Sequence, residues 1–321
     1  MSMLSRRNLL QAGATGIAML AAGRATTAGE PAAAQGGAKK GGAGKERWLL
    51  SLNMSTIRPA SLEDKVAAAQ KAGYDAVELW SDDLDKYEKA GKSLEDLAKR
   101  IKDGGMYVVN IIGIWNSMPQ DDAGKAKLME EARRKLAHAQ KVGAQHIAAI
   151  PAPDRPEFNV LWAAGRYREL VDLGKEFNVK VAVEFVSFFQ GIHTLGQAAA
   201  IAMESERPEA SVVADTFHMH NGHSAWSGVG LVAGPLYAVW HVNDVPATPE
   251  PGKMKDSDRI YPGDGILPLV PLFQTLWKNG FRGPLSLEMF NAAEYKKPAD
   301  EVAKTGIEKM RAVIAKAGVG T

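Results

Sequence analysis

Residues 212–220, VVADTFHMH, begin as a buried strand and continue with side chains that a protein interior normally excludes. The two valines and the alanine suit a packed core, whereas Asp215 and His218 follow them directly. Carboxylates and imidazoles are common ligands of divalent cations, and an imidazole can also donate or relay a proton. This stretch therefore predicts a chemical site at the end of an apolar strand.

The same kinds of side chain recur in other apolar runs. Acidic or imidazole residues stand near the ends of the second, fifth, seventh and eighth runs, and they are Glu78, Glu184, His241, Asp244 and Glu288. Carboxylates gathered at one place would repel one another, and burial would raise their pKa values. A divalent cation removes that penalty, and oxygen ligands with one imidazole suit Mn²⁺, Mg²⁺, Co²⁺ or Zn²⁺. The sequence contains no cysteine, so a thiolate site is excluded.

A regular alternation of strands and helices must position these side chains. Short apolar runs predict strands over residues 48–53, 75–80, 107–115, 146–152, 180–186, 211–217, 237–244 and 284–290. Helical patterns lie between them, and one of these begins after the capping residue Ser61 and ends at Gly73. The helix after the sixth strand is expected to be short, because residues 226–234, WSGVGLVAG, contain three glycines.

Eight strands alternating with about eight helices predict a (β/α)8 TIM barrel of about 250 residues. A doubly wound open sheet is the alternative, but it gives no reason for polar side chains at so many strand ends. In a barrel the carboxyl ends of all strands meet at one mouth, where the active sites of barrel enzymes lie. We therefore expect Asp215 to hold a metal ion and His218 to face what the metal binds.

The N-terminal segment is expected to be a targeting signal followed by a linker. Residues 1–28 place Arg6 and Arg7 before a modestly apolar run and then small residues, which resembles a twin-arginine signal peptide. A retained membrane anchor is the alternative. Residues 29–46 are a Gly/Ala/Lys-rich linker, and the barrel is expected over residues 47–321. These features predict a periplasmic protein exported by the Tat machinery.

Several motifs carry a resemblance to a known family. They are VEFV around Glu184, DTFHMH from Asp215, HVND from His241, DSDRIYPGDGILPL from Asp256 and LSLEMFNAAEY around Glu288. With them, the chain resembles the sugar phosphate isomerase/epimerase superfamily with a xylose isomerase-like TIM barrel, and within it inosose (2-keto-myo-inositol) isomerase-like proteins.

The resemblance implies which residues hold the metal and which face the substrate. The metal ligands would be Glu184, Asp215, His241 and Glu288. The two glutamates would lie on opposite faces of a bound keto sugar, where one removes a proton from carbon and the other returns one. The metal, with Mn²⁺ preferred, would stabilise the enediolate. The residues facing the substrate would be His218, Arg259 and Glu78.

Aromatic side chains and the expected export bear on the substrate. Trp115, with Trp80 and Phe217, either forms an apolar wall against a sugar ring or belongs to the core. Arg259 has a fork of donors that suits sugar hydroxyls, and we expect it to close over the substrate. An exported protein meets few phosphorylated sugars, so free keto sugars, keto-cyclitols and 3-keto-glycosides are the expected substrates. The reaction is expected to be isomerisation or epimerisation.

Other functions remain open at this point. A lyase or dehydratase would begin with the same proton removal and continue by β-elimination. An abasic-site endonuclease would need a cluster of several zinc ions, for which seven histidines are few, and a net charge of +2 does not favour DNA. A sugar-binding protein without activity is a further alternative. We expect a small-molecule partner and no nucleic acid, and the family resemblance leaves a homo-oligomer open.

Overall fold

A closed barrel of parallel strands forms the centre of the molecule. The computed structural model describes residues 46–151 and 159–321, and its strands pair in chain order from β1 to β8 and back to β1. The strands are β1 (Leu50–Asn53), β2 (Ala76–Trp80), β3 (Tyr107–Ile114), β4 (His146–Ala149), β5 (Lys180–Glu184), β6 (Ser211–Asp215), β7 (Tyr237–Val242) and β8 (Leu285–Leu287). Ser51 on β1 pairs with Ser286 on β8, which closes the sheet. The predicted (β/α)8 barrel is confirmed, and the open sheet is excluded.

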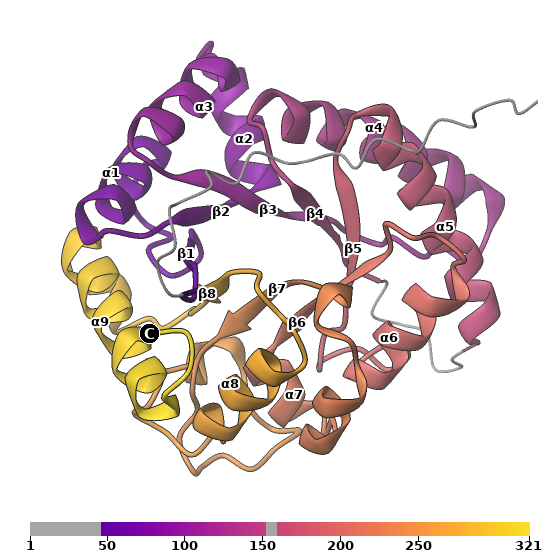
Figure 1. The fold of residues 1–321 in the computed structure, drawn as a ribbon. Coiled ribbons are helices and arrows are strands. Elements are labelled where there is room, and N and C mark those ends of the chain that lie inside the picture. Colours follow the sequence, from indigo (N-terminus) through magenta and orange to yellow (C-terminus); the bar gives the residue numbers. More distant parts are fainter. Residues whose placement is uncertain (1–45, 152–158) are drawn as a thin grey trace, which may run out of the picture. The chain divides into compact units, whose positions relative to one another are not determined.

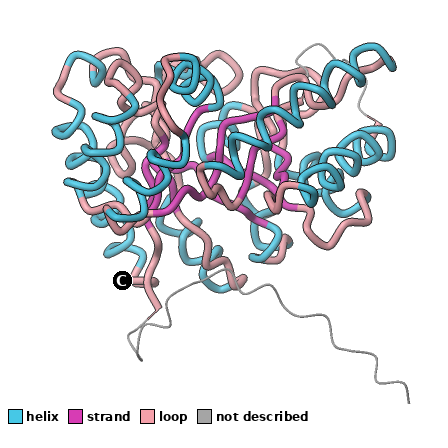
Figure 2. Tube along the Cα trace, turned by 90° about the horizontal axis from the view of Figure 1, so that it is seen from above, coloured by secondary structure: helices cyan, strands magenta, loops and turns pink. Residues whose placement is uncertain are grey.

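Helices surround the barrel on its outside (Figure 1). They are α1 (Leu62–Ala72), α2 (Ser81–Lys89), α3 (Leu94–Asp103), α4 (Asp122–Lys141), α5 (Val160–Glu176), α6 (Leu195–Glu204), α7 (Thr216–Asn221), α8 (Leu269–Lys278) and α9 (Ala299–Ala317). Short 3-10 turns are η1 (Trp226–Leu231), η2 (Gly234–Leu236), η3 (Asp256–Asp258) and η4 (Glu294–Lys296). Figure 2 shows the strands enclosed between these helices.

The signals that start and stop α1 act as the sequence predicts. The side chain of Ser61 accepts a hydrogen bond from the backbone N–H of Asp64, which satisfies one of the free donors of the first turn. Gly73 ends the helix with φ 84°, a left-handed conformation that glycine adopts without steric cost. The chain can therefore turn within a few residues into β2.

β1 and β2 end where the sequence indicates, whereas the other six strands end earlier, and the sixth shows why. Residues 211–217 were expected as strand, but β6 ends at Asp215 and α7 begins at Thr216. The Asp215 carboxylate accepts hydrogen bonds from the backbone N–H groups of Phe217 at 2.6 Å and His218 at 3.2 Å, so it caps the new helix. As expected, this helix is short, and it places His218 one turn above Asp215.

Two further findings concern membranes and the N-terminal segment. Among the described residues, none of the helices combines the length and apolar character that crossing a bilayer requires. The predicted signal peptide, residues 1–28, and the linker, residues 29–46, lie outside the described residues except for Glu46.

Candidate active site and metal centre

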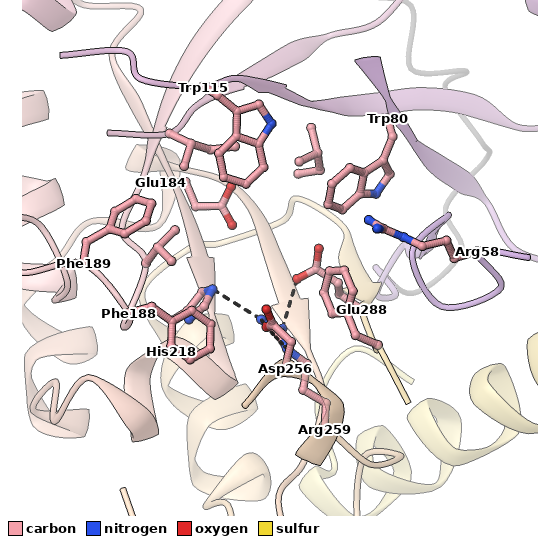
Figure 3. A pocket seen from close by; sticks show the side chains of 14 residues that line it. Arg58, Trp80, Trp115, Glu184, Phe188, Phe189, His218, Asp256, Arg259 and Glu288 are labelled. Atoms are coloured by element: carbon pink, nitrogen blue, oxygen red, sulfur yellow. Dashed lines mark hydrogen bonds and ion pairs between the residues drawn. The ribbon is translucent and has the colours of Figure 1, made fainter. Parts of the chain in front are cut away.

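A cavity of about 460 Å³ opens at the carboxyl end of the barrel (Figure 3). Its lining comes from segments at or just after the ends of several strands, as barrel topology requires. The polar lining residues are Arg58, Glu184, His218, Asp256, Arg259 and Glu288. Trp115, the aromatic residue expected at the site, also lines the cavity and is 39% exposed. The structure thus places most of the candidate residues around one space.

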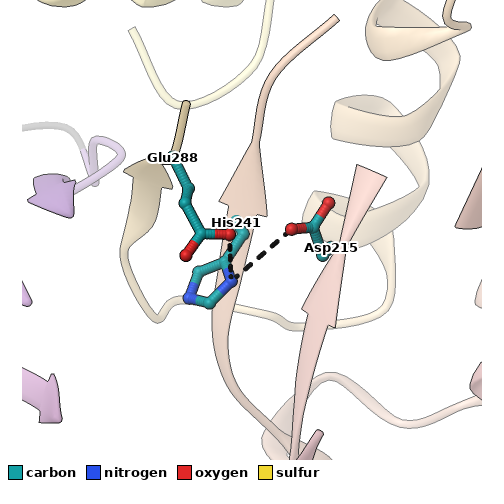
Figure 4. A group of neighbouring side chains, drawn as sticks. All are labelled: Asp215, His241 and Glu288. Carbon is teal, nitrogen blue, oxygen red and sulfur yellow. Dashed lines mark ion pairs between the residues drawn. The ribbon is translucent and has the colours of Figure 1, made fainter. Parts of the chain in front are cut away.

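A group of buried side chains in the described part of the chain has the geometry to hold a metal ion (Figure 4). Asp215, His241 and Glu288 each offer one ligand atom, and these atoms lie within 4.8 Å of one another. Nδ1 of His241 is buried without a hydrogen-bond partner, 3.2 Å from Glu288 Oε2 and 3.7 Å from Asp215 Oδ2. A buried ring nitrogen without a hydrogen-bond partner that faces two carboxylates fits a ligand of a divalent cation. A divalent metal is therefore compatible with the residues present.

Glu184, the fourth expected ligand, lies beside this group. Its Oε1 is 3.5 Å from Nδ1 of His241, and its side chain is almost fully buried at the end of β5. It does not belong to the set of ligand atoms that are all mutually close. Its carboxylate points into the cavity from the side opposite to that of Arg58 and Trp80 (Figure 3).

Arg259 lies deeper than the sequence suggested. Its side chain is 1% exposed, and Nη1 donates both to Asp215 Oδ2 and to Glu288 Oε2, the latter at 3.0 Å. Its Nη2 donates to Asp256 Oδ1 at 2.8 Å. The guanidinium therefore neutralises carboxylates next to the metal group, in addition to lining the cavity. In the structure these ion pairs hold the guanidinium in place inside the site, and it does not extend over the substrate position as we expected.

Glu78 also differs from its expected position. We expect it to face substrate near the end of its strand, but β2 runs to Trp80, as predicted, and Glu78 lies two residues before that end. The Glu78 side chain has no exposed surface and does not line the cavity. Its carboxylate accepts hydrogen bonds from Asn110 at 2.9 Å and Ser286 at 2.5 Å, and lies 3.0 Å from Nε2 of His241. These partners hold it below the metal group, inside the barrel.

Burial and neighbouring charges separate the pKa values of the carboxyl groups. Burial raises the pKa of Glu288 to about 7, and it also raises the pKa of Glu184. Burial acts in the same direction on Asp215, but the positive charge of Arg259 outweighs it and holds the pKa of Asp215 well below its usual range. The site thus contains one firmly ionised carboxylate and two that are protonated more readily.

His241 is protonated more readily than an ordinary histidine when no metal is bound. Burial lowers its pKa, but the negative charges of Glu288 and Glu78 outweigh burial and raise the pKa well above the usual value. The imidazolium and the guanidinium of Arg259 together balance the carboxylates around them. A cation that enters the group must therefore displace the proton from Nδ1 of His241.

His218 is held neutral between two donors. Burial lowers the pKa of its ring to about 4. The backbone N–H of Ser187 lies 3.2 Å from Nδ1 and its Oγ 2.9 Å away, while Asn221 Nδ2 donates to that Oγ at 3.0 Å. A backbone N–H can only donate, and so can Nη2 of Arg259, which lies 3.3 Å from Nε2, so each ring nitrogen faces a donor and only the unprotonated one accepts. A ligand oxygen bound between His218 and Arg259 would favour the proton on Nε2, because that oxygen accepts from both Nε2 and Nη2.

Several residues of the site escaped the sequence analysis. Ser187, Phe188 and Phe189 follow the fifth strand within a few residues, and Arg58 follows the first. Their position shortly after a strand is the feature of the sequence that could have indicated them as site residues. Asn53 ends β1 and donates from one amide nitrogen to both Glu78 at 3.2 Å and Glu288 at 3.0 Å. Serine, asparagine and phenylalanine are common after strands, so their type alone indicates no function.

Comparisons with known proteins agree with this geometry. A family model described as xylose isomerase-like TIM barrel matches residues 66–313. An inosose isomerase of Bacillus velezensis is 28% identical over 272 residues, which covers 82% of this chain and 95% of the relative. A 3-dehydroshikimate dehydratase of Pseudomonas aeruginosa is 22% identical over 271 residues, covering 83% of this chain and 41% of the relative. A crystal structure of IolI protein with a bound zinc atom superposes with a TM-score of 0.78 at 25% identity, covering 84% of this chain and 98% of that one.

Proposed function

Because the chain belongs to the xylose isomerase-like TIM barrel family, we propose that it is a divalent-metal-dependent isomerase or epimerase of a keto sugar or keto-cyclitol. The observation that carries the proposal is that the carboxyls of Glu184 and Glu288 both enter one cavity, Glu288 as a member of the metal group and Glu184 beside it. In the metal-free site burial raises the pKa of Glu184, and a carboxyl that titrates closer to neutral pH exchanges protons with a carbon acid more readily than an ordinary one. The inosose isomerase relatives support the substrate class.

In the proposed mechanism the side chains of the site have separate roles. One of Glu184 and Glu288 removes the proton next to the substrate carbonyl, and the other returns a proton to carbon. His218 donates from Nε2 to a substrate oxygen on which negative charge develops. Arg259 stays fixed between Asp215 and Glu288 and keeps Asp215 ionised.

The metal would be held by Asp215, His241 and Glu288, with Glu184 as the fourth ligand. When bound there, a divalent cation supplies Lewis-acid polarisation of a carbonyl group. We propose Mn²⁺ because carboxylate oxygens outnumber the single imidazole, although Zn²⁺, Mg²⁺ and Co²⁺ accept the same donors.

We also propose that the protein is exported to the periplasm. The support is the sequence alone, in which Arg6 and Arg7 precede an apolar run over residues 9–22. Replacing both arginines by lysine is expected to keep the chain in the cytoplasm, as measured by cell fractionation. Unchanged export of that variant would contradict the twin-arginine route.

A second candidate function is β-elimination from a keto sugar or keto-glycoside. The dehydratase relative favours it, because elimination begins with the same removal of a proton next to a carbonyl. The two reactions differ only after that step. Mass spectrometry of the products separates them, since elimination changes the mass of the sugar and isomerisation does not.

The test of the shared first step is exchange of the substrate α-proton with deuterium. We expect the metal-loaded protein to exchange the proton of 2-keto-myo-inositol in D₂O, followed by NMR. Glu184→Gln and Glu288→Gln are each expected to slow exchange by about 10²–10⁴-fold, the usual contribution of a general acid or base. The control is Glu169→Gln, which removes a partly exposed carboxylate paired with Lys125. Exchange at the wild-type rate in either site variant would remove the acid–base assignment.

A further inference from the structure

Two arginines line the cavity, and they differ in how their charge is balanced. Arg259 is buried and paired with three carboxylates. Arg58, in the loop after β1, is exposed, and within the described part of the chain its side chain has no ion pair and no hydrogen bond. Its guanidinium carbon lies 4.5 Å from the ring centroid of Trp80 and 5.4 Å from that of Phe290. Arg58 is therefore held against aromatic rings by cation–π contacts while its donors remain free.

The rings beneath Arg58 are themselves fixed. Nε1 of Trp80 donates to Asn53 Oδ1 at 2.9 Å, and Trp80 meets Phe290 edge to face with ring centroids 5.9 Å apart. These contacts fix the position of the two rings that the guanidinium contacts. The outer part of the cavity on the Glu288 side is thus a preorganised surface with a ring of N–H donors at its edge.

The opposite side of the cavity exposes apolar rings. Trp115 is 39% exposed and Phe188 is 45% exposed, and both line the same cavity. Figure 3 shows Phe188 and Phe189 on the side of Glu184 and His218, away from Arg58 and Trp80. Large apolar side chains left open to solvent within a concave site mark a surface for a ligand.

The size of the cavity indicates what the ligand must be. Its volume of about 460 Å³ falls within the range of roughly 300–1,000 Å³ that is typical of sites for drug-sized ligands. The proton-transferring groups Glu184, Glu288 and His218 line one part of this cavity, and Arg58 and the aromatic rings line the rest of it. The two parts adjoin, because the ring of Phe188 lies 5.6 Å from that of His218 and the ring of Phe290 lies 5.2 Å from the guanidinium carbon of Arg259.

We propose that Arg58, Trp80, Trp115, Phe188 and Phe290 form a subsite for a second ring carried by the substrate. We call these residues the rim subsite. The C–H face of a ring packs against the exposed aromatic side chains, and Arg58 donates to hydroxyl groups at the ring edge. The full substrate is then a keto sugar that carries a second ring, as in a keto-glycoside, and a one-ring keto sugar or keto-cyclitol fills only part of the cavity. This inference rests on the proposed function, because it assigns the inner ring to the reaction described above.

Exchange measurements on one-ring and two-ring probes test the rim subsite. The one-ring probe is the 3-keto form of methyl β-glucoside. The two-ring probes are the 3-keto form of phenyl β-glucoside and cellobiose that carries the 3-keto group on its non-reducing ring. We expect kcat/KM for α-proton exchange to be about tenfold higher for a two-ring probe than for the methyl glucoside, a ratio that corresponds to about 1.4 kcal/mol. Trp115→Ala and Arg58→Ala are each expected to reduce this ratio to below about threefold.

The control variant is Leu231→Ala, which shortens an apolar side chain that is 89% exposed outside the cavity and should leave the ratio unchanged. Phe188 is less suitable for replacement, because its ring lies 5.6 Å from the ring of His218. A preference for the cellobiose probe would assign the second ring to a sugar, and a preference for the phenyl probe to an aromatic aglycone. Equal kcat/KM for all three probes, or a ratio that survives both rim variants, would overturn the proposal.

Calorimetry separates failure of the rim subsite from failure of the proposed function. If none of the probes exchanges its proton, the proposed reaction is wrong for these sugars, but binding is still measurable. The metal-loaded protein is then titrated with cellobiose and with methyl β-glucoside. If the wild type binds cellobiose more tightly than methyl β-glucoside and Trp115→Ala does not, the result supports the rim subsite independently of the reaction. If the wild type and Trp115→Ala bind cellobiose with equal affinity, the result refutes it.

Discussion

Oε1 of Glu78 lies 3.0 Å from Nε2 of His241, and neither side chain has any exposed surface. Burial raises the pKa of Glu78, but His241 and the surrounding hydrogen bonds outweigh it, so the pKa is lowered and the group is ionised. An ionised carboxylate at this place can only accept, so Nε2 of His241 carries a hydrogen atom and donates a hydrogen bond to it. The other ring nitrogen, Nδ1, is thereby turned toward Asp215 and Glu288 as the ligand atom. Glu78 is a positioning residue in this arrangement.

Glu78→Gln should weaken metal binding without removing a ligand. The amide keeps the shape of the side chain but takes away the charge that orients the imidazole and makes it more basic. Loss of such a partner typically costs about 10–100-fold in metal affinity. We expect a loss of this size for Mn²⁺ and for Zn²⁺ by calorimetry. Affinity equal to that of the Glu169→Gln control would show that Glu78 does not support His241.

The low pKa of His218 gives a prediction about how activity depends on pH. Its pKa of about 4 means that the ring is neutral above that pH, so it does not titrate between pH 5 and 9. Any loss of activity as pH falls from 8 to 6 must then come from other groups. We expect His218→Gln to lower kcat by about 10²-fold or more while the acidic limb of the pH–rate profile keeps its midpoint. Disappearance of that limb in the variant would show that His218 titrates in the working range.

Ser187→Ala tests the same arrangement from the other side of the ring. It removes the Oγ contact at 2.9 Å but leaves the backbone N–H of residue 187 facing Nδ1. We therefore expect a smaller effect on kcat than that of His218→Gln, with the same pH midpoint. An effect as large as that of the His218 variant would show that the hydroxyl, and not the backbone, holds the ring.

The sequence predicted the barrel, the family and the strand ends that carry the site, because these depend on patterns within short segments. Val212 and Val213 mark a buried strand, and Asp215 marks its end. The depth of each side chain was harder to predict. The sequence places Glu78 and Glu184 each two residues before a strand end. In the structure β2 continues to Trp80 and keeps Glu78 inside the barrel, whereas β5 ends at Glu184.

Contacts between distant residues were not predictable from single segments. Arg259 is separated by 44 positions from Asp215, and only the closed barrel brings its guanidinium to that carboxylate. The same holds for Arg58 and Trp80, whose stacking depends on how the loop after β1 folds back over the mouth. Local periodicity indicates which face of an element is buried, but it does not indicate which loop residues meet above the barrel.

Replacement of Arg259 should destabilise the metal-free protein. Its guanidinium is 1% exposed and pairs with Asp215 and Glu288, so Arg259→Ala leaves buried carboxylates without a partner. Removing one member of a buried ion pair typically costs about 3–5 kcal/mol. We expect the free energy of unfolding in urea to fall by about this amount without metal, and by less with saturating Mn²⁺, which replaces part of the lost positive charge. An equal loss with and without metal would place Arg259 outside the electrostatics of the metal group.

Metal uptake should release protons and should therefore weaken as pH falls. In the metal-free site the pKa of Glu288 is about 7 and that of His241 is well above its usual value, so both groups hold protons at pH 6.5 that a cation must displace. Because both pKa values are raised, the protonated forms persist to higher pH, and each displaced proton raises Kd by about tenfold per pH unit below the pKa of its group.

Calorimetry at pH 6.5 in two buffers of different ionisation enthalpy counts these protons. We expect between one and two protons released per Mn²⁺ in the wild-type protein. Glu288→Gln should release fewer, because the amide has no proton to lose, whereas Glu169→Gln should match the wild type. Since a carboxyl of ordinary pKa near 4.5 would already be ionised at pH 6.5, binding without proton release would mean that neither Glu288 nor His241 is held in its protonated form before the metal enters.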